Sequence, residues 1–279
     1  MKRTIVGAAV VAGVALAAAP AQAAPKVDPV KELKAELAPG RAVNVLATAK
    51  VTYSPGQYAT SELDGTIGFG TRGVVASDVA HTLRYSPDLL RRMMKAEPEQ
   101  TEALQQSSTR MISAGDVSYV SGPVVEEGLR RADASWVRYG GVAVPAGNLL
   151  LEVVEPGTLK TLLAERTSAR DGVVKGSITT KKLASVSDAF VERFGAPSKK
   201  SRVGKISYTL WFGADGLIQR VSAKGVLPVG DKGSVQVESE TRFMDWGRQV
   251  TVLLPLEGDV IDKKEVEDDV PTGVPGIWN

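Results

Sequence analysis

Alternation between apolar and polar residues dominates the chain after its first forty residues. A strand that is buried on one face alternates in this way, so the pattern predicts strands over 42–53, 58–69 and 74–85. Ser54-Pro55-Gly56 separates the first two segments, and Gly70-Thr71-Arg72-Gly73 separates the second from the third. Both are turn sequences, so we expect the three strands to pair in order as an antiparallel meander.

The alternation of apolar and polar residues continues along the rest of the chain and is interrupted by a few segments with helical spacing. Strand patterns cover 109–120, 134–139, 169–180, 205–212, 217–226 and 233–246. Helical patterns cover 89–106, with Pro98 breaking or kinking it midway, 157–165, and 183–194, which ends at Gly195. Strands joined mainly in sequence, with few inserted helices, indicate one large antiparallel sheet of the α+β class.

One face of this predicted sheet is apolar. Positions of equal parity are apolar in several strands, and such a face must be covered. The inserted helices could cover it completely and make an ordinary core, or incompletely and leave a cavity for an apolar ligand. The candidate ligand-binding residues of such a cavity are Leu63, Ile67, Phe69, Tyr119, Trp136, Leu210, Phe212, Val221 and Phe243.

The N-terminus predicts export. Lys2 and Arg3 precede an apolar run over 4–19, and Ala21-Gln22-Ala23 has the small residues of a cleavage site. The run is shorter than the roughly 20 residues that a membrane-spanning helix needs. We therefore predict a secretory signal peptide over 1–23, with an uncleaved anchor as the alternative, and a secreted protein of the cell envelope.

Composition narrows the class further. The chain has no cysteine, so neither a disulfide nor a lipid-bearing cysteine is possible, and we expect no covalent membrane anchor. About 256 residues remain after the signal peptide (279 minus 23), enough for a core that is stable without disulfides. The remaining basic and acidic residues balance at 32 each (34 minus Lys2 and Arg3, against 32), which argues against nucleic acid as a partner.

Residues that commonly carry catalysis or bind metals are scarce. His81 is the only histidine, and it lies in a predicted strand, where we expect a structural role. The acidic run 265–269 is interpreted as a solvated terminus, and the G-x-S-x-G pattern of serine hydrolases does not occur. We therefore expect no catalytic residues, no metal site and no cofactor, and a binding or structural protein rather than an enzyme.

Several short segments, taken in order, resemble the LppX/LprG-type lipoproteins of actinobacteria, whose fold is similar to LolA. The likeness is carried by 116–120, 134–138, 155–163, 172–179, 210–221 and 243–252. Within the fifth segment, Leu210-Trp211-Phe212 leads through the Asp215-Gly216 turn into Arg220-Val221.

The resemblance implies a curved antiparallel half-barrel over 41–262 that wraps a few helices around an apolar cavity. A linker over 24–40 would precede it and a flexible tail over 263–279 would follow.

In that family the cavity takes up acyl chains, so the first hypothesis is a secreted carrier or chaperone for a lipid or other apolar ligand. The second is an envelope sensor or protein-interaction domain with a filled core, a protein partner and no ligand. Relatives carry a lipobox cysteine that this chain lacks, and the family offers no ligand-contact motif to transfer.

Overall fold

The computed structural model describes residues 27–71, 73–141, 147–196, 202–229, 233–266, 270–274 and 277. The predicted signal peptide, 1–23, lies outside the described residues. The strands are β1 Arg41–Ser54, β2 Gln57–Gly70, β3 Gly73–Tyr85, β4 Thr109–Ala114, β5 Val117–Ser121, β6 Trp136–Gly140, β7 Arg166–Arg170, β8 Val173–Thr179, β9 Lys205–Phe212, β10 Ile218–Val229, β11 Gly233–Gln249 and β12 Val260–Asp262. The helices are α1 Pro29–Glu36, α2 Pro87–Ala96, α3 Pro98–Gln106, α4 Glu126–Ala132, α5 Pro156–Ala164, α6 Thr180–Ala184 and α7 Asp188–Phe194.

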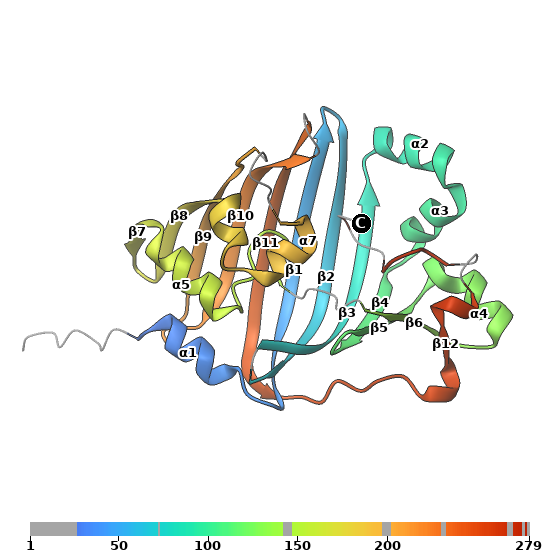
Figure 1. Cartoon of the computed structure of the whole chain (residues 1–279), viewed down its shortest axis with the longest axis horizontal. Helices are drawn as coiled ribbons and strands as arrows, with labels where there is room; N and C mark the ends of the chain where they lie inside the picture. Colours follow the sequence, from blue (N-terminus) through green and yellow to red (C-terminus); the bar gives the residue numbers. More distant parts are fainter. Residues whose placement is uncertain are drawn as a thin grey trace, which may run out of the picture.

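The described strands form one open twelve-stranded sheet in the order β12-β6-β5-β4-β3-β2-β1-β11-β10-β9-β8-β7 (Figure 1). Every neighbouring pair is antiparallel except β12 and β6, which are parallel. The predicted α+β class with a large antiparallel sheet is therefore confirmed. The meander of the first three strands is also confirmed, and β11 returns to pair with β1, which brings the last long strand to the middle of the sheet.

Two segments predicted as strands are hairpins. Segment 109–120 divides into β4 and β5 at Gly115, whose φ is +61°, and 169–180 divides into β7 and β8 at Asp171 and Gly172, with φ of +52° and +74°. A two-residue turn with positive φ reverses the chain without interrupting its apolar–polar alternation, so the pattern alone did not locate either turn.

The helices begin and end where local chemistry dictates. Pro98 separates α2 from α3, as predicted, because proline cannot donate a hydrogen bond to the preceding turn. The hydroxyl of Ser86 caps α2 by accepting from the backbone N–H of Leu89. The helix predicted over 183–194 is two helices, α6 and α7, because Ser187 caps a new N-terminus within it.

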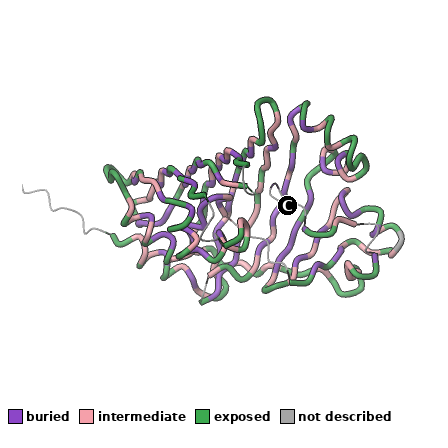
Figure 2. The backbone as a smooth tube through the Cα atoms, turned by 45° about the horizontal axis from the view of Figure 1, so that its top comes forward, coloured by how far each residue is buried: buried purple, intermediate pink, exposed green. Residues whose placement is uncertain are grey.

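The sheet has an inner and an outer face. We define the inner face as the one that carries the fully buried side chains of Val43, Val45 and Val51 in β1. The outer face carries the intervening residues, such as Lys50 and its register partners Thr60 and Glu238. In Figure 2 buried residues run along the strands in the middle of the molecule, whereas the turns at its ends are exposed.

Two groups of elements cover the inner face (Figure 1). Strands β7–β11, which we call the β7–β11 half, are covered by α5, α6, α7 and the loop 147–155. Strands β1–β6, the β1–β6 half, are flanked by α2, α3 and α4, and Pro271 and Ile277 accept hydrogen bonds from Tyr139 in β6 and Tyr53 in β1. The core lies between these covers and the sheet.

Both ends of the described chain pack against this core. The predicted linker 24–40 contains α1, which Asp28 caps and which buries Leu33. In the predicted flexible tail, the side chains of Val266, Val274 and Ile277 are 6%, 4% and 7% exposed and belong to the core. These described residues differ from the expectation of a solvated tail, because the apolar residues alternate with turn formers and can follow an irregular path over an apolar surface.

Candidate functional site

Seven of the predicted ligand-binding residues lie on the inner face. Registers with β1 and between neighbouring strands place them there: Leu63, Ile67, Phe69, Leu210, Phe212, Val221 and Phe243. Most are buried, whereas Leu63 and Phe212 are partly buried against the core. Parity within long strands was therefore a sound guide to the face.

Tyr119 and Trp136 lie on the outer face, so their prediction as inner-face residues was wrong. The hairpin at Gly115 changes which parity faces inward: Met111 of β4 pairs with Val120 of β5. Tyr119 therefore faces outward, and Trp136 does so in turn, because Val120 pairs with Val137. The guanidinium of Arg110 lies 5.5 Å from the centre of the Trp136 ring on this outer face.

An aromatic cluster closes one end of the inner face. The Trp246 ring stacks on Phe69 and Phe243, with ring centroids 5.8 and 5.6 Å apart, and its indole N–H donates to the carbonyl of Ile218 at 2.8 Å. Strand parity alone excluded Trp246 from the candidates, since it is out of phase with Phe243. The positive φ of Asp245, +57°, breaks the alternation and turns the indole to the same side.

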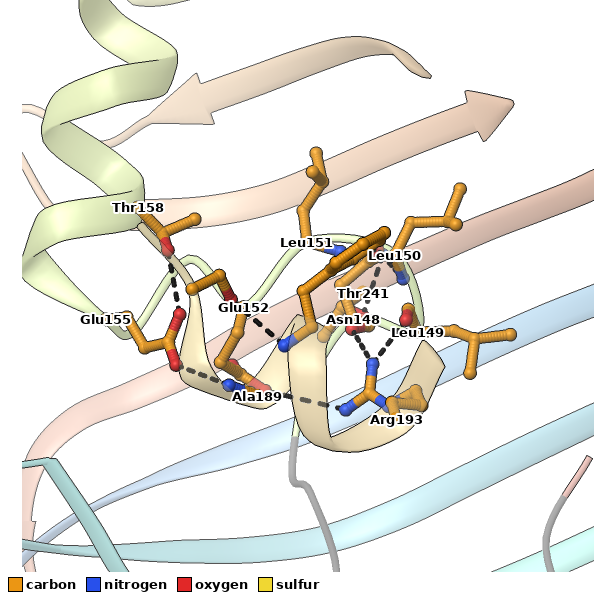
Figure 3. A network of polar contacts seen from close by, with 12 residues as sticks. Asn148, Leu149, Leu150, Leu151, Glu152, Glu155, Thr158, Ala189, Arg193 and Thr241 are labelled. Atoms are coloured by element: carbon orange, nitrogen blue, oxygen red, sulfur yellow. Dashed lines mark hydrogen bonds and ion pairs between the residues drawn. The ribbon is translucent and has the colours of Figure 1, made fainter. Parts of the chain in front are cut away.

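A polar network holds the loop 147–155 against the β7–β11 half (Figure 3). The Asn148 side chain is fully buried, and its carbonyl oxygen accepts from the backbone N–H groups of Leu150 and Leu151, both at 3.1 Å. The same oxygen accepts from the Ser239 hydroxyl at 2.7 Å, and the amide donates to Thr241 at 3.3 Å. Asn148 thus joins the loop to β11 through one side chain.

A buried contact between Arg193 and Glu152 completes this network. The Arg193 guanidinium of α7 donates to the carbonyls of Asn148 and Leu149 and lies 3.9 Å from the Glu152 carboxylate. Burial raises the pKa of Glu152 to about 8, although Arg193 acts in the opposite direction. Glu155 adds a third link, accepting from the Thr158 hydroxyl at 2.7 Å and from the N–H of Ala189 at 3.0 Å.

The β7–β11 half is consequently a filled core. The loop and α5 insert apolar side chains that are at most 1% exposed: Leu150, Leu151, Val153, Leu159 and Leu162. Leu210 and Val221, both fully buried, therefore face protein atoms. A ligand that reached them would have to displace a loop held by buried hydrogen bonds.

The β1–β6 half has an inner face of mixed character. Ile67, Val79 and Met111 lie beside a strip of polar residues that are also buried: Ser77, His81, Thr109, Ser113 and Ser118. The hydroxyls of Ser113 and Ser118 are 2.9 Å apart, and the Ser77 hydroxyl has no hydrogen-bond partner among the described residues. Burial lowers the pKa of His81 to about 4, so its imidazole is neutral at pH 7.

A separate hollow of about 500 Å³ lies on the outer face. Charged and hydroxyl side chains surround it, among them Lys50, Glu62, Arg84, Lys224, Glu238 and Glu240. The Lys224 ammonium and the Glu238 carboxylate form an exposed ion pair at 2.7 Å. This lining does not suit an apolar ligand, so the inner face stays the candidate site.

Comparisons with known proteins return structural matches of low TM-score. No protein-family model matches the chain, and no curated protein matches it. A LolA superfamily protein, NE2245 from Nitrosomonas europaea, is similar over 80% of this chain and 93% of its own, with 8% identity and a TM-score of 0.27. A lipovitellin structure titled for its lipid–protein interactions is similar over 79% of this chain and 26% of its own, with 12% identity and a TM-score of 0.26. With such low TM-scores, neither establishes a family or a ligand.

Two further observations concern the described residues. None of their helices is both long enough and apolar enough to cross a membrane. They also contain no group of three or more histidine, aspartate or glutamate side chains placed to hold a metal ion.

Proposed function

We propose that this chain is an exported protein that binds a lipid or another apolar ligand on the inner face of its sheet. The supporting observation is the open sheet itself, whose inner face is apolar across the central strands and needs a cover that the helices only partly supply. Helices α2, α3 and α4 lie beside the β1–β6 half (Figure 1), and Pro271 and Ile277 are hydrogen-bonded to Tyr139 and Tyr53 on strands at its two sides. Burial of acyl surface would stabilise a complex there by roughly 25 cal/mol per Å².

The filled β7–β11 half favours a second function. A sheet whose inner face is wholly occupied by its own chain would act as an envelope sensor or protein-interaction domain, with a protein partner and no ligand. The loop 147–155 already occupies half of the inner face in this way. The two functions therefore differ in whether the inner face of the β1–β6 half binds a ligand or is occupied by the protein's own chain.

Native mass spectrometry of the mature protein, secreted by its own host and then extracted with organic solvent, distinguishes the two. We expect a lipid or other apolar molecule in near-stoichiometric amount. A protein that arrives empty and also fails to take up fluorescent fatty acids would contradict the carrier function and support the interaction domain. The same preparation, analysed at its N-terminus, tests export, since cleavage after Ala23 or one residue later is expected.

We further propose that the protein is not an enzyme. Hydrolysis of a broad panel of esters that disappears when one serine is replaced would contradict this.

A further inference from the structure

The hollow on the outer face lies over the middle of the sheet, on β10, β11, β1, β2 and β3. Its volume of about 500 Å³ is within the roughly 300–1,000 Å³ that small-ligand sites occupy. The sheet itself separates this hollow from the inner face. A ligand in the hollow would therefore not compete with a ligand on the inner face.

Strand register arranges the polar side chains of the hollow in two rows that run across the strands. The first, which we call the basic row, is Lys224, Glu238, Lys50, Thr60 and Arg84. The second, the acidic row, is Ser222, Glu240, Thr48, Glu62 and Thr82. The rows are two residues apart along each strand, about 7 Å, and each row is roughly 19 Å long. A ligand between the rows meets mainly cations on one side, and carboxylates and hydroxyls on the other.

Contacts within the protein hold part of this charge pattern in place. The Lys224 ammonium lies 2.7 Å from the Glu238 carboxylate, and the Lys50 ammonium lies 4.0 Å from the centre of the Tyr58 ring. Glu62 is exposed and forms no ion pair with another described residue. Its carboxylate is therefore available to accept hydrogen bonds from a ligand, next to cations that are already positioned.

The balance of charge in the hollow disfavours a highly charged ligand. Three cations and three carboxylates line it: Lys50, Arg84, Lys224, Glu62, Glu238 and Glu240. Such a lining has no net charge to attract a polyanion or a polycation. Ammonium and guanidinium groups only donate hydrogen bonds and carboxylates only accept them, whereas a hydroxyl does both. A neutral ligand with closely spaced hydroxyl groups therefore satisfies both rows.

The same hollow is poorly suited to a protein partner. The apolar residues among the described lining are Ala49 and Ala223, whereas the centres of protein interfaces are rich in aromatic residues and methionine. Strand β1 is paired with β2 on one side and with β11 on the other, so no free strand edge is present here for a partner strand to extend.

We propose that this hollow on the outer face is a binding site for a neutral oligosaccharide, whose hydroxyl groups accept from the cations of the basic row and donate to the carboxylates of the acidic row. This ligand and this face go beyond the proposed function, which concerns the inner face. The hydroxyls of Thr48, Thr82 and Ser222 add neutral hydrogen bonds within the acidic row. Charge-assisted hydrogen bonds are about twice as strong as neutral ones, so charged groups such as Lys50 and Glu62 contribute most of the affinity.

Isothermal titration calorimetry of the secreted protein with neutral oligosaccharides tests this proposal. The probes are maltotriose, cellotriose, mannotriose and N,N′,N″-triacetylchitotriose, which differ in linkage and in the groups on the ring. We expect at least one of them to bind with a Kd of about 1 mM or tighter.

Two variants place the bound probe in the hollow. Glu62→Gln removes the charge of the carboxylate and should weaken binding roughly tenfold. Thr48→Tyr puts a large side chain at the centre of the hollow and should weaken binding at least tenfold. The matched control is Asp64→Asn, which neutralises an exposed carboxylate on the same strand and face but outside the hollow, and it should bind as the wild type does. Urea unfolding checks that each variant is folded.

Three outcomes would overturn the proposal. Binding of none of the probes to the wild type would refute the ligand class. Equal binding in the wild type, Glu62→Gln and Thr48→Tyr would place the saccharide outside the hollow. A photocrosslinking residue at position 48 that captures a protein in the native host, instead of a saccharide, would make the hollow a protein contact. Uptake of fluorescent fatty acids, which tests the proposed function, should be the same in both variants, so the two proposals can fail independently.

Discussion

Two segments without regular structure cover the two halves of the same sheet, and they are held in different ways. The loop 147–155 is joined to its half by the buried amide of Asn148 and by Arg193 and Glu155, which form hydrogen bonds between loop, helix and strand. The described C-terminal residues 270–274 and 277 pack through the apolar side chains of Val270, Val274 and Ile277, and the carbonyls of Pro271 and Ile277 accept hydrogen bonds from Tyr139 and Tyr53. A cover held by a polar network is hard to displace, because each broken hydrogen bond leaves a buried polar group without a partner. Apolar contacts can be replaced by contacts with another apolar molecule.

The largest effect on stability should come from raising the pH, which acts on Glu152 in the loop 147–155. The pKa of Glu152 in the folded state, about 8, is above the ordinary value of 4.5, so the folded protein binds a proton that the unfolded chain has released. Stability is therefore full below pH 4.5 and falls as the pH rises through 8, by on the order of 4 kcal/mol. Urea unfolding between pH 5 and 8.5 measures the loss, and Glu152→Gln should remove most of it. A wild type that is equally stable at both ends of this range would contradict the burial of the carboxyl.

Removing the Asn148 side chain should have the next largest effect on stability. Asn148→Ala leaves the N–H groups of Leu150 and Leu151 without an acceptor, which should cost roughly 3 kcal/mol. The urea midpoint should fall with an unchanged m-value. Ser168→Ala, on an exposed strand of the same half, is the control and should change stability by less than about 0.5 kcal/mol. If Asn148→Ala lowered the free energy of unfolding by no more than the control does, the Asn148 side chain would not hold the loop.

Acid should act on the opposite half. The pKa of His81 in the folded state, about 4, is below its ordinary value of 6.5, so stability is full above pH 6.5 and falls as the pH drops toward 4, by roughly 2–3 kcal/mol. Hydrogen exchange should accelerate in β3 and β4 at pH 5 and around the loop 147–155 at pH 8. His81→Gln should lose the acid dependence while keeping the alkaline one. The same acid dependence in the variant would show that another group is responsible.

Trimming the C-terminal segment should cost less stability than any of these changes. Val274→Ala removes two buried methyl groups and should lower the free energy of unfolding by about 1–2 kcal/mol. Urea unfolding measures the loss, and a midpoint equal to that of the wild type would contradict the burial of Val274.

The smallest effect on stability should come from Tyr53→Phe, which removes a hydrogen bond of 3.4 Å to the carbonyl of Ile277. The expected cost is below about 1 kcal/mol. Limited proteolysis of the C-terminus should nevertheless become faster, while cleavage near the loop 147–155 stays unchanged. Equal protection of the C-terminus in the variant and the wild type would show that the tyrosine does not hold the segment.

The inner face could be predicted wherever strands are long. Ile67 and Leu210 were placed correctly because alternation over a long strand leaves one consistent parity. Tyr119 and Trp136 were placed wrongly because the tight turn at Gly115 exchanged the parities without breaking the pattern. Trp246 was missed because one residue with positive φ, Asp245, turned it against its expected phase. Local backbone conformation, which apolar–polar counting does not register, explains all three errors.

The sequence by itself determined the class of the fold, the order in which its first strands pair and the apolar character of one sheet face, because strand periodicity and turn chemistry are local properties. Only the tertiary structure decided what covers that face. Asn148 meets Ser239 and Thr241, about ninety residues further along the chain, and Ile277 returns to Tyr53 at the start of the sheet. Contacts over such separations depend on the whole topology, and no local pattern encodes them.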